Sequence, residues 1–150
     1  MVKRVESVHR AFTKKLPDVN ALTYRERLSV LRLESLELRR LKADLIMCFK
    51  TLKGFTNIIS SEFFKRSTCN TRGHSMKLYY PDSTVLARQN FFSVRVVQVW
   101  NNLPNEVVSA TCVSVFKSLL NSIDVSFLAL CFSDGLLLGS CKCSLSLSVQ

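Results

Sequence analysis

Acidic residues are scarce in this sequence. Eleven aspartates and glutamates stand against 21 lysines and arginines among 150 residues, so the formal net charge is +10 and the isoelectric point is near 9.7. No two aspartates are adjacent, whereas two-metal nucleotidyl transfer requires a close cluster of carboxylates. The sequence therefore predicts that the chain by itself is not an enzyme of the polymerase or nuclease class. The positive charge favours nucleic acid or another anionic surface as a partner.

Long apolar runs are also missing. The most apolar stretch, 125–139, is interrupted by Ser133, Asp134 and Gly135, and it falls short of the roughly 20 residues that cross a bilayer. The first residues lead into charged side chains and not into an apolar signal core. We therefore expect no membrane partner, reduced thiols for the six cysteines, and a nuclear or cytoplasmic location.

Metal-ligand patterns are equally sparse. Zinc ligands usually come as Cys-x2-4-Cys pairs with spaced histidines, but only Cys141 and Cys143 are close together, and His9 and His74 stand apart. A nucleophilic pair of Cys69 and His74 would need a positioned base and an oxyanion site, which the sequence does not indicate. We expect no metal and no other cofactor.

The composition that remains is that of a globular protein, and the length fits one domain. No proline-rich or glycine-rich linker divides residues 1–120, which carry 20 basic and 9 acidic side chains and hence a net charge of +11. Residues 121–150 are apolar and serine-rich and alternate with period two near the end. The expected fold is mainly α: a small helical domain over 1–120, with at most one short strand or hairpin, and an atypical tail over 121–150.

Helical periodicity predicts most of the body. Thr23 and Glu26 have capping-box spacing, and a helix is expected from residue 24 to about residue 33. Ser35 precedes the strongest apolar period, which predicts a helix that stops at Gly54. Further helices are expected over 2–15, 90–102 and 113–120, a turn or short helix over 62–66, and a short strand over 76–80. The expected core includes Leu38, Leu41, Leu45, Cys48, Phe49, Phe91, Phe92, Val96 and Trp100.

Six short strings occur in one order between residues 3 and 120. They are RAFTKKLP (10–17), LTYRERL (22–28), LELRRL (36–41) followed by DLI (44–46) and Lys50, TRGHS (71–75), FFSVRVV (91–97) and WNNLP (100–104). In this order they resemble the C-terminal region that follows the polymerase core in Jockey-like, LINE-type non-LTR retrotransposon reverse transcriptases.

This resemblance implies a larger parent polyprotein, with an endonuclease and a reverse transcriptase upstream of the present sequence. Relatives of this type end with a polar helix soon after the matching region, whereas here 125–150 are apolar and serine-rich. A frame change or translated flanking DNA explains such a tail. A truncated copy of an element therefore stands as an alternative to a working protein.

Candidate binding residues lie between Phe63 and Arg95, where cations alternate with Tyr79, Tyr80 and other aromatics and Asp82 is the one acidic residue. Cationic side chains bind phosphates and aromatic faces stack on unpaired bases, so the mixture favours RNA or DNA backbone as the partner. The candidate nucleic-acid-binding residues are Lys65, Arg66, Arg72, His74, Lys77, Arg88 and Arg95.

Two interpretations stay open for the string that contains His74. Gly73 permits a tight backbone turn, so Arg72 and His74 could project together toward a bound strand. Alternatively, the segment is a structural loop in which His74 forms a hydrogen bond with the backbone.

Two functions also stay open for the whole chain. The first is an accessory region that holds template RNA or target DNA near an upstream active site. The second is an interaction module that docks on the polymerase domain of the parent polyprotein through an apolar surface. Binding that weakens steeply with salt would favour the first, and salt-insensitive association would favour the second.

Overall fold

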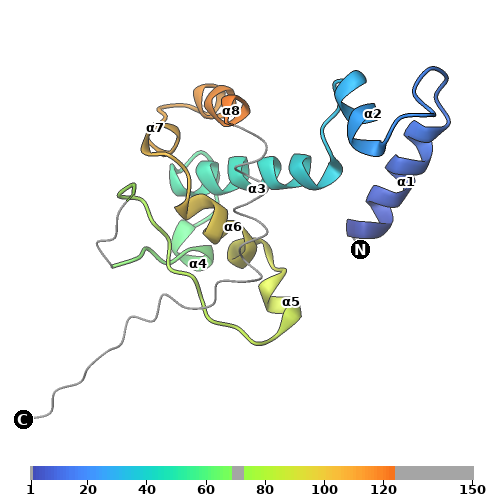
Figure 1. Ribbon diagram of the computed structural model, residues 1–150. Helices are drawn as coiled ribbons and strands as arrows, with labels where there is room; N and C mark the ends of the chain where they lie inside the picture. The colour runs from blue at the N-terminus through green and yellow to red at the C-terminus, as the bar shows by residue number, and fades with distance from the viewer. Residues whose placement is uncertain (1, 69–72, 124–150) are drawn as a thin grey trace, which may run out of the picture.

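The structure is a computed structural model that describes residues 2–68 and 73–123, and this part of the chain is mainly helical (Figure 1). The predicted fold class is confirmed for this part, whereas the predicted tail lies almost entirely outside it. The helices are α1 (Val2–Lys14), α2 (Tyr24–Val30), α3 (Leu36–Leu52), α4 (Ser60–Phe63), α5 (Leu86–Gln89), α6 (Phe92–Asn101), α7 (Asn105–Val108) and α8 (Val113–Ser122).

The long helix α3 has the start, the buried face and the stop that the sequence predicts. The Ser35 hydroxyl accepts a hydrogen bond from the Leu38 N–H at 3.2 Å, which satisfies one of the free donors of the first turn. Leu45 and Phe49, one helical turn apart, are fully buried. The helix ends at Leu52, and Gly54 then adopts a φ of +75°, which glycine reaches without steric cost.

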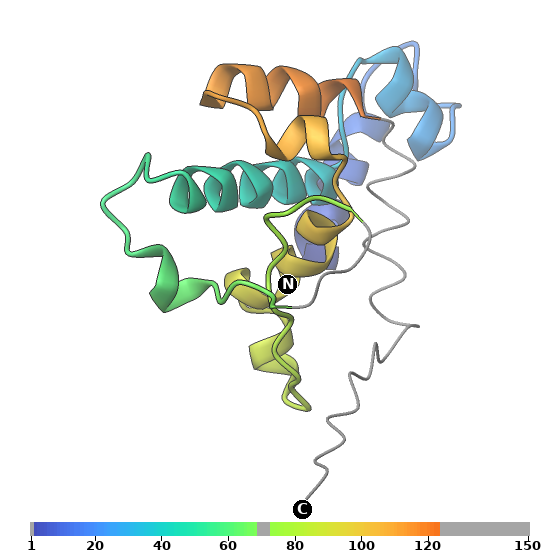
Figure 2. The ribbon, with the colours of Figure 1, turned by 90° about the vertical axis from the view of Figure 1, so that its left-hand side faces the viewer.

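Helix α3 lies between α6 on one side and α8 on the other, and both views of the ribbon show this arrangement (Figures 1 and 2). The Phe49 ring stacks on Phe116 of α8 with 4.2 Å between centroids, and the Trp100 ring of α6 lies 6.2 Å from the same phenylalanine. All three side chains have no exposed surface. The aromatic cluster therefore joins the three helices into one hydrophobic core.

An ion pair and a side-chain hydrogen bond fix the outer helices to α3. Arg95 of α6 donates from Nε and Nη2 to the two carboxylate oxygens of Asp44, each at 2.8 Å. Lys42, which is 8% exposed, donates to Glu34 and, at 2.9 Å, to the side-chain oxygen of Asn121 in α8. Because such charges are costly to bury alone, the Arg95–Asp44 pair favours one register of α6 against α3. The hydrogen bond from Lys42 to Asn121 does the same for α8.

Several predicted boundaries shift. The helix that begins after the Thr23 capping box ends at Val30 and not near 33, because Arg32 takes a left-handed φ of +53°. The short helix expected over 62–66 lies at Ser60–Phe63 instead. The strand expected over 76–80 is reduced to a single antiparallel bridge between Arg66 and Leu78.

The predicted core is confirmed with two exceptions. Phe92 is only partly buried, although it packs against the core cluster. The prediction for Phe91 is wrong, because this residue is the N-cap of α6 and its side chain is 48% exposed. The other expected core residues are buried, and the apolar residues of α8 complete the cluster with Phe116 and Leu120.

Candidate nucleic-acid interface

The candidate interface is a short pairing of two extended segments, which we call the basic hairpin and define as residues 65–67 and 77–80. The Ser67 N–H donates to the Lys77 carbonyl at 2.9 Å, and the Tyr79 N–H donates to the Lys65 carbonyl at 2.7 Å. These two bonds flank the Arg66–Leu78 bridge. The segment that carries the first predicted cations therefore lies directly beside the one that carries the tyrosines.

The C-terminal end of α6 holds the second segment in place. The Trp100 indole N–H donates to the Met76 carbonyl at 2.9 Å. The Asn101 amide donates to the Leu78 carbonyl and its oxygen accepts from the Leu78 N–H, both at 2.8 Å. Leu78 itself is 2% exposed and belongs to the hydrophobic core. The hairpin backbone is thus anchored by three hydrogen bonds and one buried side chain.

The side chains of the basic hairpin that face solvent are cationic and aromatic. Lys65 and Arg66 are exposed, and Tyr79 and Tyr80 are 51% and 44% exposed. The Lys65 ammonium lies 5.5 Å from the centroid of the Tyr79 ring, which is within the range of a cation–π contact. A phosphate can bind such a cation while a neighbouring base stacks on such a ring, which is how single strands are commonly held.

The remaining predicted cations differ in their surroundings. Arg88 is exposed on α5. Lys77 is half-buried, and its chain passes so close to Gly73, which has a φ of +118°, that a Cβ there would lie 2.9 Å from the Lys77 Cε. Arg72 lies outside the described residues, so its role stays a prediction.

His74 lies in the interior. Its imidazole is 3% exposed, and its Nε2 lies 2.9 Å from the Trp100 carbonyl, to which it donates in the tautomer that places the proton there. Burial lowers the pKa of His74 below its ordinary value, and its Nδ1 atom has no hydrogen-bond partner among the residues that the structure describes. Of the two interpretations of this residue, the geometry fits the structural loop in which the histidine binds backbone.

Arg95 is also engaged inside the fold. In addition to its bidentate pair with Asp44, it donates from Nη1 to the Asn90 carbonyl at 2.8 Å. Of the six candidates that the structure describes, Lys65, Arg66 and Arg88 have exposed side chains, and Lys65 and Arg66 lie on the basic hairpin.

Sequence reasoning missed Asn101. The string WNNLP contains Asn101, but no local pattern shows that its amide binds a segment 23 residues earlier. In an extended segment alternate side chains face opposite sides, which agrees with a buried Leu78 and an outward Tyr79 but does not explain the exposure of Tyr80.

Within residues 2–68 and 73–123, no group of three or more histidine, cysteine, aspartate or glutamate side chains is arranged to hold a metal ion. No helix in these ranges has the length and apolar character needed to span a bilayer.

Comparisons of the chain with family models, with curated proteins and with solved structures find no match.

Proposed function

We propose that the chain is a non-catalytic accessory region of a non-LTR retrotransposon reverse transcriptase, and that its basic hairpin binds the backbone of template RNA or target DNA. The observation that carries the proposal is the Lys65 ammonium, which lies 5.5 Å from the centroid of the exposed Tyr79 ring, on a hairpin that also exposes Arg66 and Tyr80. The backbone that presents these side chains is held by Trp100 and Asn101 before any ligand arrives. Such pre-organisation reduces the ordering cost of binding.

The surroundings of the acidic side chains support a non-catalytic role. Asp44 is paired with Arg95, Glu34 with Lys42, and Glu6 accepts from Tyr24. These three carboxylates therefore serve the fold, and each is satisfied by a partner within the chain. A metal-dependent nuclease or polymerase site would instead need carboxylates that converge on one open position.

The proposed binding has little sequence preference, because cations and stacking faces contact features that every nucleotide shares. A labelled single-stranded RNA titrated across a salt series tests it. Replacing Lys65 and Arg66 with alanine should make the slope of log Kobs against log salt shallower by about 1.4, the value for two lost phosphate contacts on a single strand. Replacing Tyr79 with alanine should weaken binding by about 1 to 3 kcal/mol.

A matched control is available on α3, where Arg39 and Arg40 form another adjacent pair of exposed cations. Their replacement by alanine should change the slope less than the hairpin variant does. Equal effects of the two double variants would mean that diffuse charge and no particular site binds RNA. A flat slope for the unmodified chain would contradict the nucleic-acid proposal altogether.

A second candidate function is an interaction module that docks on the polymerase domain of the same polyprotein. It is favoured by an exposed apolar face on α1, formed by Val5, Val8 and Phe12. Association with the polymerase domain that does not weaken with salt would support this function in place of the first. The DNA upstream of the coding sequence distinguishes these two functions from a truncated element copy. An intact reverse transcriptase reading frame there would favour a working protein, and a broken or missing frame would indicate a truncated copy.

A further inference from the structure

Helix α1 packs on the rest of the molecule through its polar side. The Tyr24 hydroxyl donates to one Glu6 carboxylate oxygen at 2.5 Å, and the Leu36 N–H donates to the other at 3.1 Å. The buried guanidinium of Arg27 donates from Nε to the hydroxyl of Thr13 at 3.3 Å, and Thr13 has no exposed surface. Polar bonds thus set the orientation of α1, and this orientation is the reverse of what an amphipathic helix usually adopts.

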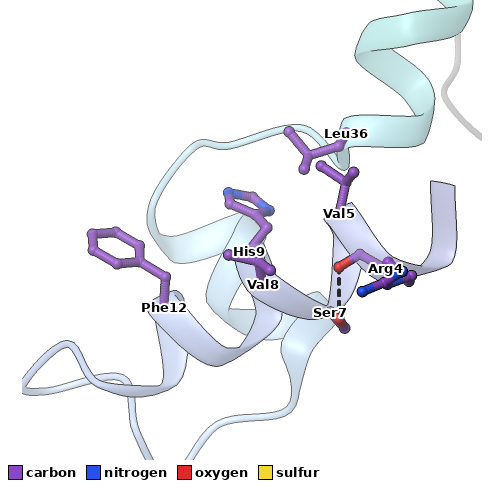
Figure 3. A pocket seen from close by; sticks show the side chains of 7 residues that line it. All are labelled: Arg4, Val5, Ser7, Val8, His9, Phe12 and Leu36. Carbon is purple, nitrogen blue, oxygen red and sulfur yellow. Dashed lines mark hydrogen bonds between the residues drawn. The ribbon is translucent and has the colours of Figure 1, made fainter. Parts of the chain in front are cut away.

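The apolar side of α1 consequently faces outward. Val5, Val8 and Phe12 are 53%, 68% and 61% exposed, and their spacing of three and four residues aligns them along two helical turns, about 10 Å. We call these three residues the α1 stripe. They line an open hollow of about 690 Å³ together with Arg4, Ser7, His9 and Leu36, and Figure 3 shows Leu36 closing the end beside Val5.

Charge around the α1 stripe has one sign. Arg4, which lines the hollow, and Lys15, which follows the last residue of α1, are exposed. Arg10 lies over the Tyr24 ring on the packed side, and Glu6, the one carboxylate of the helix, is taken up by Tyr24 and Leu36. A second copy of the chain would bring like charges together, which disfavours pairing of two stripes.

We propose that the α1 stripe docks an acidic amphipathic helix of a partner protein. The apolar residues of that helix, repeated at three and four positions, enter the hollow against Val5, Val8 and Phe12, as in helix-in-groove recognition. Its aspartates and glutamates face Arg4 at one end of the stripe and Lys15 just beyond the other. This inference does not rest on nucleic-acid binding, because the basic hairpin and the α1 stripe lie on different elements.

A labelled synthetic peptide of about 14 residues, four helical turns long, tests the proposal with the full chain. It carries leucines at spacings of three and four and glutamates at the flanking positions, and a control peptide carries lysines in place of the glutamates. Fluorescence anisotropy should show binding of the acidic peptide and none of the basic one. Phe12→Ala and Val8→Asp should each weaken binding by about tenfold or more, as expected when a central apolar contact is lost.

Val115→Asp is the matched control, because Val115 is 43% exposed on the surface of α8, and its binding should equal that of the unmodified chain. Circular dichroism should show unchanged helix content in all variants. Equal weakening by Val115→Asp, or equal binding of both peptides, would overturn the proposal. Three other results would also overturn the proposal. Binding to phosphatidylserine vesicles that depends on Val8, without peptide binding, would assign the stripe to a lipid surface, and self-association that depends on Val8 would assign it to a second copy of the chain. Peptide binding that appears only when the chain ends at Ile123 would assign it to residues 124–150.

Discussion

His74, Trp100 and Met76 illustrate how single polar groups fold this chain back on itself. The carbonyl of Trp100 contacts the His74 imidazole, and the indole N–H of the same residue binds the Met76 carbonyl. One tryptophan therefore fills the core with its ring and positions a distant loop with its polar atoms. Its burial follows from the apolar helical period around it, but its two loop contacts span 24 and 26 residues and leave no local trace in the sequence.

Burial of His74 predicts a pH-dependent stability. Because burial lowers the pKa of His74 below 6.5 in the folded state, the unfolded chain binds a proton more readily than the folded one. Its contribution to stability is complete above pH 6.5 and is lost as the pH falls below this value toward the lower folded pKa. Urea unfolding between pH 7.5 and 5.5 should show this loss for the unmodified chain.

The same series with His74→Gln should lack that part of the decrease, whatever the overall stability of the variant. His9→Gln retains His74 and should keep the decrease. If His74→Gln and the unmodified chain lose stability in parallel over this range, the imidazole does not remain neutral in the folded state.

At the level of elements, sequence periodicity predicts the longer helices well and their orientation poorly. The helices around Leu45, Val96 and Phe116 were expected because apolar residues recur at three and four positions and because Ser35 and Gly54 mark clear ends. The four-residue helices α5 and α7 were not expected, since so few residues give no measurable period. For α1 the period defines an apolar side, but the bonds of Glu6 and Thr13 decide which way it faces.

The attachment of the basic hairpin to α6 depends on Asn101. Its amide satisfies both main-chain groups of Leu78, a nearly buried residue. Asn101→Ala leaves these groups unpaired and should lower the free energy of unfolding by about 1 to 3 kcal/mol. Chemical denaturation measures this change, and the RNA affinity of the variant should also fall, since the tyrosine-bearing segment loses its anchor.

Asn102→Ala is the control, because Asn102 is the exposed neighbour of Asn101. Replacements of exposed residues usually change stability by no more than about 0.5 kcal/mol. Similar losses for the two alanine variants would show that the amide bonds to Leu78 do not hold the hairpin.

At the level of the whole molecule, the candidate site was partly predictable. The charge excess and the alternation of cations with aromatics pointed to the segment that contains Lys65, Arg66 and Tyr79. Composition could not show that Arg95 is paired with Asp44 or that His74 is buried, because both facts depend on contacts between distant elements. The number of cations that face solvent is therefore smaller than the sequence suggests.

Among the described residues, the hydrophobic core extends to the end of α8. Phe116 and Leu120 of α8 are buried against α3 and α6, and Lys42 reaches Asn121. A chain that ends at Ile123 keeps all of these contacts, so we expect its helix content, melting temperature and RNA affinity to match those of the full chain. It should also be more soluble, because 124–150 contain only three charged residues among many leucines and serines.

Circular dichroism, thermal melting and the RNA titration compare the two chains directly. A shorter chain that melts at a clearly lower temperature would show that residues after Ile123 contribute to the core, and the division of the sequence into a helical domain and an added tail would then be wrong.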